Sequence, residues 1–239
     1  MDERIEAIFN PRSVALVGAS GKEGKMGNVF AKNLADGYEG TIYMINPKGE
    51  EVLGYQAYPD VKSVPGPIDL AVIVVPSKAV PAVMEELAEA GAKAAVVITA
   101  GFSEVGEEGR TLEEKMMEPA RRAGMKVVGP NCFGIYNCNI GLNASLGIGT
   151  PPRGGDISFL TQSGAYGMAI FTFALDHSMR FAKIMAHGNK AGIEDYEVLE
   201  YLGEDPETEV ICLFLESVDR GREFFEVAKR VGLKKPIVA

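Results

Sequence analysis

Cysteine is scarce in this sequence, with only Cys132, Cys138 and Cys212 among 239 residues. The number is odd and no two of them form a CxxC pair. A disulfide framework and a structural zinc site are therefore disfavoured, and we expect no metal site in this chain. The same usage is typical of a reduced, cytoplasmic protein, and we expect that location.

Long apolar runs and clusters of positive charge are also missing. No stretch reaches the roughly 18 apolar residues of a membrane span. The first residues, MDERIEAIF, are charged, unlike the basic start and apolar middle of a signal peptide. The formal net charge is −9, whereas nucleic acids attract clustered Lys and Arg. We expect neither a membrane nor a nucleic acid as a partner.

Short apolar runs alternate with helical patterns through residues 1–130. Runs such as ValAlaLeuVal are apolar throughout, as strands are when helices cover both faces of a parallel sheet. The sequence therefore predicts an α/β, Rossmann-like doubly wound domain. The expected strands are 13–17, 41–46, 70–75, 94–99 and 126–128, and the expected helices are 26–35, 79–90 and 109–123.

Residues 131–152 lack periodicity and are rich in Gly, Asn and Pro, which indicates a linker. The alternation restarts in residues 153–239, with strands expected at 156–160, 181–186, 210–215 and 236–239 and helices at 165–177, 193–203 and 220–231. This second unit is interpreted as an open, flavodoxin-like sheet. Because it ends on an uncovered apolar strand, we expect it to be incomplete, with the natural polypeptide continuing or another chain completing it.

A glycine-rich loop, GlyAlaSerGlyLysGluGlyLysMetGly at 18–27, follows the first strand and precedes a helix. Glycines allow a ligand to approach the backbone closely, and a helix N-terminus offers free N–H groups and a positive dipole end. The loop therefore predicts a phosphate-bearing ligand, with an ordinary tight turn as the alternative.

The second strand ends in AsnProLys, residues 46–48. A domain that binds NAD places Asp or Glu there to hold the ribose hydroxyls. Lys48 favours a phosphorylated ribose instead, as in CoA or NADP, unless it is only a solvated surface charge. Segments 74–77, 99–104 and 129–134 end the next three strands, where ligands of open α/β sheets bind.

Taken in order, these segments resemble a known family. The pieces are SerValAlaLeuValGlyAlaSer, IleAsnProLys, ValValProSer, ThrAlaGlyPheSerGlu, GlyProAsnCysPheGly, ThrGlnSerGly, GlyAsnLysAla and GluAspProGluThr, and they span nearly the whole chain. The sequence resembles the α subunit of succinyl-CoA synthetase and, more closely, the ADP-forming acetyl-CoA synthetases and related acyl-CoA synthetases.

The resemblance implies that the first domain binds coenzyme A. Ser20 and Lys25 would lie near the CoA phosphates, Lys48 near the adenosine end, and Asn131 with Cys132 near the thiol. Cys132 is interpreted as a pocket residue and not as a nucleophile, because no base lies near it in sequence. The full set of expected CoA-binding residues is Gly18, Ser20, Gly21, Gly24, Lys25, Asn46, Lys48, Pro76, Gly101, Asn131 and Cys132.

The second domain carries an expected phosphate site. Thr161, Gln162, Ser163 and Gly164 form a strand-to-helix turn whose hydroxyls and N–H groups suit an anion. In the relatives this turn holds the phosphate of a phosphohistidine, and Glu216 matches the catalytic acid that orients the histidine. A simple surface or capping carboxylate is the alternative for Glu216.

The phosphorylated histidine itself is expected beyond Ala239. His177, at a helix end, is interpreted as a surface residue, and His187 is not assigned as the phosphohistidine although it lies near the expected site.

The resemblance thus implies an NDP-forming acid–CoA ligase, which would convert acyl-CoA, ADP and phosphate to acid, CoA and ATP. ATP, ADP and Mg²⁺ would be bound only by an ATP-grasp domain or β subunit, so we expect this chain to be inactive alone. We also expect the complete enzyme to be an oligomer. A CoA-sensing regulatory module and an NAD(P)-dependent oxidoreductase remain as alternatives.

Overall fold

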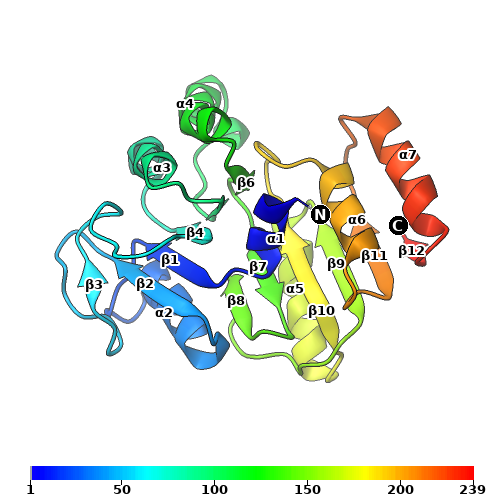
Figure 1. The fold of residues 1–239 in the computed structure, drawn as a ribbon, viewed down its shortest axis with the longest axis horizontal. Helices are drawn as coiled ribbons and strands as arrows, with labels where there is room; N and C mark the ends of the chain where they lie inside the picture. Colours follow the sequence, from blue (N-terminus) through cyan, green and yellow to red (C-terminus); the bar gives the residue numbers. More distant parts are fainter. Residues whose placement is uncertain (1) are drawn as a thin grey trace.

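The computed structural model describes residues 2–239, which form two α/β units side by side (Figure 1). The first contains a six-stranded parallel sheet in the order β3-β2-β1-β4-β5-β6. Its strands are β1 (Ser13–Val17), β2 (Thr41–Ile45), β3 (Ala57–Tyr58), β4 (Leu70–Ile73), β5 (Ala94–Val97) and β6 (Lys126–Val128). The doubly wound parallel sheet expected from the apolar runs is confirmed, and β3 is an additional edge strand.

Helices cover both faces of this sheet. They are α1 (Glu3–Phe9), α2 (Met26–Gly37), α3 (Val80–Glu89) and α4 (Glu107–Ala123), with short 3₁₀ turns η1 (Ser77–Ala79) and η2 (Ser103–Val105). Alternate residues of β1 serve opposite cores: Val14 and Leu16 pack with α1 and α2, whereas Ala15 and Val17 pack with α3 and α4. This explains the uninterrupted apolar run, because neither face of the strand meets water.

The second sheet is mixed, in the order β12-β11-β9-β10-β7-β8. Its strands are β7 (Gly134–Asn137), β8 (Leu142–Ser145), β9 (Ile157–Thr161), β10 (Phe181–Ala186), β11 (Val210–Phe214) and β12 (Ile237–Val238). Strands β9 to β12 are parallel, as expected for a flavodoxin-like unit, whereas β7 pairs antiparallel with both β8 and β10.

The interpretation of residues 131–152 as a linker without regular structure is therefore corrected. The segment contains the β7–β8 hairpin, both strands of which are fully buried, and β7 extends the second sheet by pairing with β10. The pairing supplies backbone hydrogen bonds that the local Gly- and Asn-rich sequence does not indicate. A division of the chain into domains at residues 130 and 153 stays a prediction.

Three helices flank the second sheet: α5 (Gly164–Asp176), α6 (Asp195–Glu204) and α7 (Gly221–Gly232). Phe171 and Ala174 of α5 pack on one face with Phe159 and Ile184. The face covered by α6 and α7 belongs to the same hydrophobic cluster as the α1 and α2 side of the first sheet. One apolar core thus runs continuously through both units.

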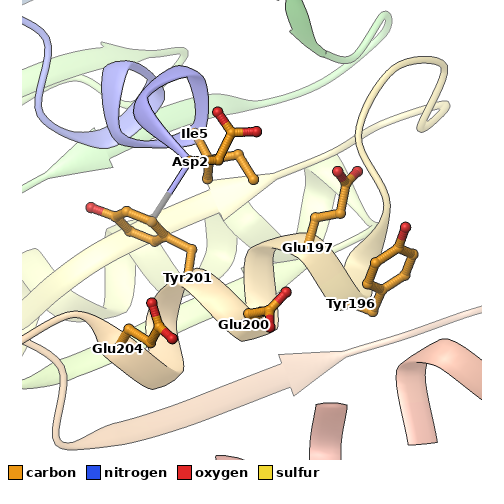
Figure 2. A pocket seen from close by; sticks show the side chains of 7 residues that line it. All are labelled: Asp2, Ile5, Tyr196, Glu197, Glu200, Tyr201 and Glu204. Atoms are coloured by element: carbon orange, nitrogen blue, oxygen red, sulfur yellow. The ribbon is translucent and has the colours of Figure 1, made fainter. Parts of the chain in front are cut away.

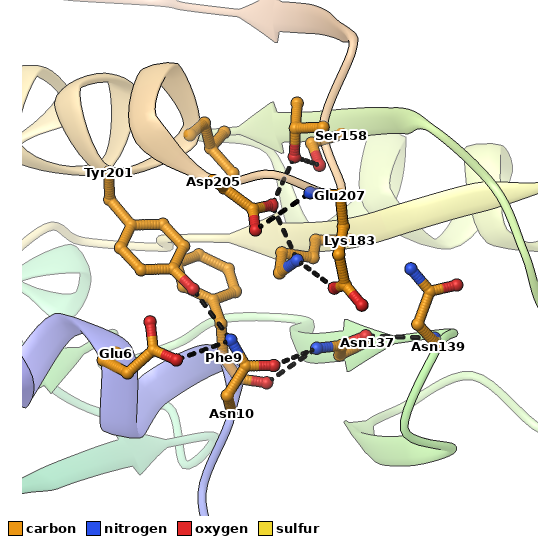
Figure 3. Close-up of polar contacts among 12 residues, drawn as sticks. Glu6, Phe9, Asn10, Asn137, Asn139, Ser158, Lys183, Tyr201, Asp205 and Glu207 are labelled. Atoms are coloured by element: carbon orange, nitrogen blue, oxygen red, sulfur yellow. Dashed lines mark hydrogen bonds and ion pairs between the residues drawn. The ribbon is translucent and has the colours of Figure 1, made fainter. Parts of the chain in front are cut away.

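Polar contacts around α1 join the two units as well (Figure 3). The Asn10 side-chain amide donates to Tyr201 Oη at 2.9 Å, and the Asn137 amide donates to Asn10 Oδ1 and to the Phe9 carbonyl, each at 2.9 Å. Asn33 of α2 likewise donates to the Ser145 carbonyl at the end of the hairpin, at 3.0 Å. These side-chain amides hold the two units together, because each takes part in a hydrogen bond that crosses from one unit to the other.

A buried cation lies in the middle of the second sheet, also visible in Figure 3. Lys183 of β10 is 1% exposed and donates to Asp205 Oδ2 and Glu207 Oε2, each at 2.7 Å. Removing both partners would leave a buried charge uncompensated. Among residues 2–239, no helix is both long and apolar enough to cross a membrane.

Candidate functional site

The glycine-rich loop after β1 closes tightly onto α2. Gly18 and Gly24 have φ of +99° and +78°, which favour glycine. A Cβ on Gly27 would overlap the Gly18 carbonyl oxygen, so only glycine allows α2 to start this close to β1. The glycines therefore allow the loop and the start of α2 to pack closely together, as a phosphate-binding loop requires.

The N-terminus of α2 has no side-chain cap, and its first turn carries no acidic residue. Its N-cap residue is Lys25, whose side chain is exposed, while Ser20 Oγ accepts from the Lys22 N–H at 3.1 Å. Gly21 lies at the exposed tip of the loop. The free N–H groups, the helix dipole and the nearby lysines all favour an anion here.

At the end of β2, Asn46 Oδ1 accepts from the Lys48 N–H at 2.9 Å, forming a turn that reverses the chain. The Lys48 side chain is 74% exposed, and its ammonium lies 3.9 Å from Glu50, a loose contact at the surface. Such an exposed pair contributes little, so Lys48 is free to meet a ligand phosphate.

The loops after the next strands are joined to one another at the carboxyl edge of the sheet. Thr99 Oγ1 donates to the Val75 carbonyl at 2.7 Å, and the Asn131 N–H donates to the Thr99 carbonyl at 3.0 Å. A Cβ on Gly101, whose φ is +106°, would lie 3.0 Å from Ser77 Oγ, next to exposed Pro76. The expected ligand residues of these loops are therefore brought together.

Cys132 is less accessible than expected for a pocket residue. Its side chain is 3% exposed and its thiol donates to the Val97 carbonyl at 3.4 Å. Burial raises the pKa of the thiol to about 12, which makes a nucleophilic thiolate at neutral pH unfavourable. Its neighbour Asn131, at φ +56° and exposed, presents its side chain at this loop instead.

The N-terminus of α5 lies beside that same loop. A Cβ on Gly164 would be 3.5 Å from the Phe133 backbone nitrogen. Ser163 is the N-cap and its hydroxyl accepts from the Tyr166 N–H at 3.3 Å, while Thr161 Oγ1 accepts from the Ser163 N–H at 3.0 Å. Within residues 2–239, the Gly164 N–H donates to no protein group, so this helix end can receive an anion.

Gln162 differs from its three neighbours, because its side chain is hydrogen-bonded to the turn after β11 and to α6. Its Oε1 accepts from the Glu216 and Ser217 N–H groups at 2.8 and 2.9 Å, and its Nε2 donates to Asp195. Glu216 itself lies in an exposed turn after β11. The structure thus connects Glu216 to the expected phosphate site through residue 162.

A buried polar cluster that the sequence analysis missed stands behind this turn. Asp195, at the start of α6, is 2% exposed and accepts from Lys190 Nζ at 3.0 Å. His187 is fully buried, its Nε2 lies 3.8 Å from Asp195 Oδ1, and neither ring nitrogen has a hydrogen-bond partner within residues 2–239. Burial lowers the pKa of His187 to about 4, so the ring is neutral. The GlyAsnLysAla motif at 188–191 lies next to this cluster in the sequence and could have indicated it, but no functional role was assigned to the motif.

His177 behaves as expected for a surface residue. It is exposed at the end of α5, and its ring stacks on Phe173 with centroids 4.0 Å apart.

A separate pocket of about 270 Å³ lies between α1 and α6 (Figure 2). Its lining is mostly acidic and aromatic: Asp2, Ile5, Tyr196, Glu197, Glu200, Tyr201 and Glu204. None of the expected site residues lines it. In residues 2–239 no group of three or more His, Cys, Asp or Glu side chains is arranged to hold a metal ion.

The geometry agrees with the known families that the chain matches. Residues 12–137 match the CoA binding domain family, and residues 154–239 match the succinyl-CoA ligase like flavodoxin domain. The chain therefore belongs to the CoA-binding domain family and joins to that domain a succinyl-CoA ligase-like flavodoxin domain.

Relatives with assigned names are similar over nearly the whole chain. Acetate–CoA ligase (ADP-forming) I of Archaeoglobus fulgidus is 45% identical, over 98% of this chain and 34% of its own length. The α subunit of acetate–CoA ligase (ADP-forming) I of Pyrococcus furiosus is 43% identical, over 98% of this chain and 52% of its own. This chain thus spans about a third to a half of the length of these relatives.

Solved structures show the same arrangement of both units. The protein PH0766 of Pyrococcus horikoshii superposes with a TM-score of 0.93 at 42% identity, over 98% of this chain and 53% of that one. The dinucleotide forming acetyl-coenzyme A synthetase 1 of Ca. Korarchaeum cryptofilum, in complex with phosphate and ADP, gives 0.93 at 41% identity, over 98% and 51%. These similarities confirm the family suggested by the sequence motifs and the two-unit α/β fold.

Proposed function

We propose that this chain is the CoA-binding part of an NDP-forming acid–CoA ligase. One observation carries the proposal: the loop at Asn131 ends the CoA-domain sheet and also lies against the α5 N-terminus of the second unit. A thioester bound at the first site would meet a phosphate bound at the second. That juxtaposition suits reaction between the two, because proximity removes much of the entropic cost of bringing them together.

In this proposal the loop of Gly18, Gly21 and Gly24, with Ser20 and Lys25, holds the CoA pyrophosphate. Lys48, with the turn made by Asn46, meets the 3′-phosphate. The pantetheine arm then follows Pro76 and Gly101 to Asn131, where the thioester stands. The buried Cys132 contributes its backbone and the shape of the pocket, since its thiol faces Val97.

The α5 N-terminus supplies the phosphate site, with N–H groups that stabilise negative charge on the phosphate oxygens. A phosphate oxygen attacks the thioester carbonyl, the C–O bond forms, and the C–S bond breaks to release CoA thiolate and an acyl phosphate. A histidine beyond this chain takes the phosphoryl group from the acyl phosphate, leaving the free acid, and Glu216 orients that histidine. ADP and Mg²⁺ belong to an ATP-grasp domain or β subunit, which receives the phosphoryl group to form ATP.

Two other functions predict different ligands. A CoA-sensing module would bind CoA without needing the α5 anion site or Glu216, and an NAD(P)-dependent oxidoreductase would bind a nicotinamide nucleotide. The ligase is favoured because the anion site stands beside the loop of Asn131. An oligomeric assembly and a cytoplasmic location are part of the proposal and are tested by light scattering and cell fractionation.

Calorimetric titration of this chain with CoA, NADP and NAD tests the first step. CoA should bind, and NAD should not. Preferential binding of NADP or NAD would contradict the proposal.

The ligase and the sensor are separated by labelling with acetyl-CoA and phosphate. A longer polypeptide, extended with the region that the relatives carry after this one, should gain acid-labile, base-stable phosphate on a histidine, whereas this chain should not. Labelling of His187 in this chain would show that the active histidine has been misplaced.

A further inference from the structure

Gln162 uses every hydrogen-bonding position of its amide within the protein. The residue is 8% exposed. Its Oε1 accepts from the N–H groups of Glu216 and Ser217, at 2.8 and 2.9 Å. Its Nε2 donates to the Ser217 carbonyl at 2.7 Å and to Asp195 Oδ1 and Oδ2 at 3.1 and 3.0 Å. An amide has two donor hydrogens and one acceptor oxygen with two lone pairs, so nothing remains for a phosphate.

These bonds continue the sheet beyond its last backbone pair. Strands β9 and β11 are in register up to Thr161 and Phe214, and the Gln162 N–H still donates to the Phe214 carbonyl at 3.1 Å. Beyond Phe214 the two strands no longer pair through their backbones, and the Gln162 side chain makes the next hydrogen bonds between them. It both donates to and accepts from the Ser217 backbone. The turn that carries the exposed Glu216 is thereby held against β9.

Asp195 determines the orientation of the Gln162 side-chain amide, that is, whether its NH₂ group or its oxygen faces Asp195. Its carboxylate is buried and also accepts from Lys190 Nζ at 3.0 Å, and an ionised carboxylate only accepts hydrogen bonds. It therefore attracts the NH₂ end of Gln162 and leaves the oxygen facing the Glu216 and Ser217 N–H groups. A glutamate at position 162 would instead place a second carboxylate against Asp195, which is unfavourable for two like charges in a buried site.

We infer that Gln162 is a positioning residue, oriented by Asp195, that fixes the turn of Glu216 and Ser217 and does not bind phosphate. The inference rests on the proposed function only in assigning a catalytic role to Glu216. The fixed turn holds the backbone of Glu216, from which the carboxylate projects, in one position, whereas a flexible turn would leave that carboxylate without a defined position.

A charge exchange tests this directly. Hydrogen exchange of residues 216–217 is followed in wild type, Gln162→Glu, Asp195→Asn and the double variant. At pH 7.5, Q162E should lose protection of these amides by about tenfold or more, because its carboxylate is repelled by Asp195. The double variant should regain most of it, since the amide introduced by D195N can donate to the carboxylate introduced by Q162E. Lowering the pH to about 5 should also restore protection in Q162E, because one proton can then bridge the two carboxyl groups.

A second variant covers the case in which Q162E fails to fold. Gln162→Met has similar length and no charge, so it should lose the protection at every pH and regain none on acidification. Protection of residues 216–217 that survives in Q162M, or a Q162E loss that neither the second substitution nor acid reverses, would overturn the inference.

Two binding measurements keep this result apart from the proposed function. CoA affinity should stay within about twofold of wild type in every variant, because Gln162 lies on the second unit. Sulfate affinity at the α5 N-terminus should fall by a smaller factor than the hydrogen-exchange protection of residues 216–217. If Q162M abolished sulfate binding while residues 216–217 stayed protected, Gln162 would be a phosphate ligand after all. Failure of the wild type to bind CoA would refute the ligase and leave the exchange result unaffected.

Discussion

The side-chain amide of Asn189 lies 2.6 Å from Glu104 Oε2, and this hydrogen bond crosses from the second unit to the first. The same nitrogen is 3.0 Å from both Ser103 Oγ and Glu113 Oε2. Glu104 in turn accepts from the Gly101 N–H. One asparagine thus connects the turn at 188–191 to the loop that carries an expected CoA-binding glycine.

Because of this contact, a negative charge at position 189 should destabilise the protein. Burial would raise the pKa of Glu104, but hydrogen bonds from Asn189 and from the Gly101 backbone outweigh it and lower that pKa. Replacing Asn189 by Asp would put a third carboxylate beside Glu104 and Glu113 and remove the shared donor. We expect N189D to lose about 1–3 kcal/mol of stability at pH 8 in urea unfolding, and less at pH 5, because repulsion within the new cluster of three carboxylates and the lost donor favour its protonation in the variant.

Asn139→Asp is the matched control for that substitution. Asn139 Oδ1 accepts from the Gly154 N–H at 3.0 Å, and an aspartate retains the acceptor. N139D should therefore change stability little at either pH. An equal loss in both variants would indicate a general effect of added negative charge. It would refute the claim that the loss in N189D arises from the contacts of Asn189 with Glu104 and Glu113.

Gly27→Ala tests the close approach of α2 to β1. The new methyl would clash with the Gly18 carbonyl, so α2 and the glycine-rich loop must shift. We expect a loss of about 1–3 kcal/mol in urea unfolding, and CoA affinity at least about tenfold weaker by calorimetry. Gly221→Ala is the control: apart from its own chain neighbours and helix backbone, no atom lies within 4 Å of its added Cβ, and stability should hold or rise slightly. Undiminished CoA binding in G27A would count against CoA binding by this loop.

Lys48→Ala tests the placement of the CoA 3′-phosphate. Loss of one charge-assisted contact should weaken CoA binding by about 1–2 kcal/mol, while dephospho-CoA, which lacks that phosphate, should be little affected. Lys229→Ala makes the same charge change on the exposed last turn of α7 and should leave both affinities unchanged. Equal losses for CoA and dephospho-CoA would show that Lys48 does not face the 3′-phosphate.

His187 should make stability depend on pH. Its pKa is lowered to about 4 mainly by burial, which outweighs the attraction of Asp195, while nearby Lys190 lowers it further. The unfolded chain, with a histidine pKa near about 6.5, binds the proton first, so stability is full above about pH 6.5 and is lost as the pH falls toward about 4. The loss should reach roughly 2–3 kcal/mol.

His187→Leu should remove most of that dependence, and it should not destabilise at pH 7.5, because both ring nitrogens lack partners within residues 2–239. His177→Leu, at the exposed end of α5, should leave the pH profile as it is. Urea unfolding at pH 7.5 and 5 compares the three proteins. A wild-type slope that persists in H187L would assign the titration to another group.

Much of the fold followed from local patterns. The apolar runs at β1, β4 and β5 are buried on both sides, so they can be recognised without any knowledge of their partners. The β7–β8 hairpin cannot, because its Gly, Asn and Ser residues are locally typical of a loop. It is part of the sheet only because β10, more than 40 residues further on, pairs with β7.

In the candidate functional site, too, some features follow from local sequence and others depend on the tertiary structure. The sequence by itself determined the glycine loop, the missing acid after β2 and the helix start at Ser163, because each depends on residue type and position within one strand–loop–helix unit. Only the tertiary structure decided that Gln162 faces Asp195 and the turn of Glu216, that His187 is buried without hydrogen-bond partners among residues 2–239, and that Asn189 reaches Glu104. Those relationships join residues distant in the chain, and side-chain direction at the ends of strands is set by the packing around them.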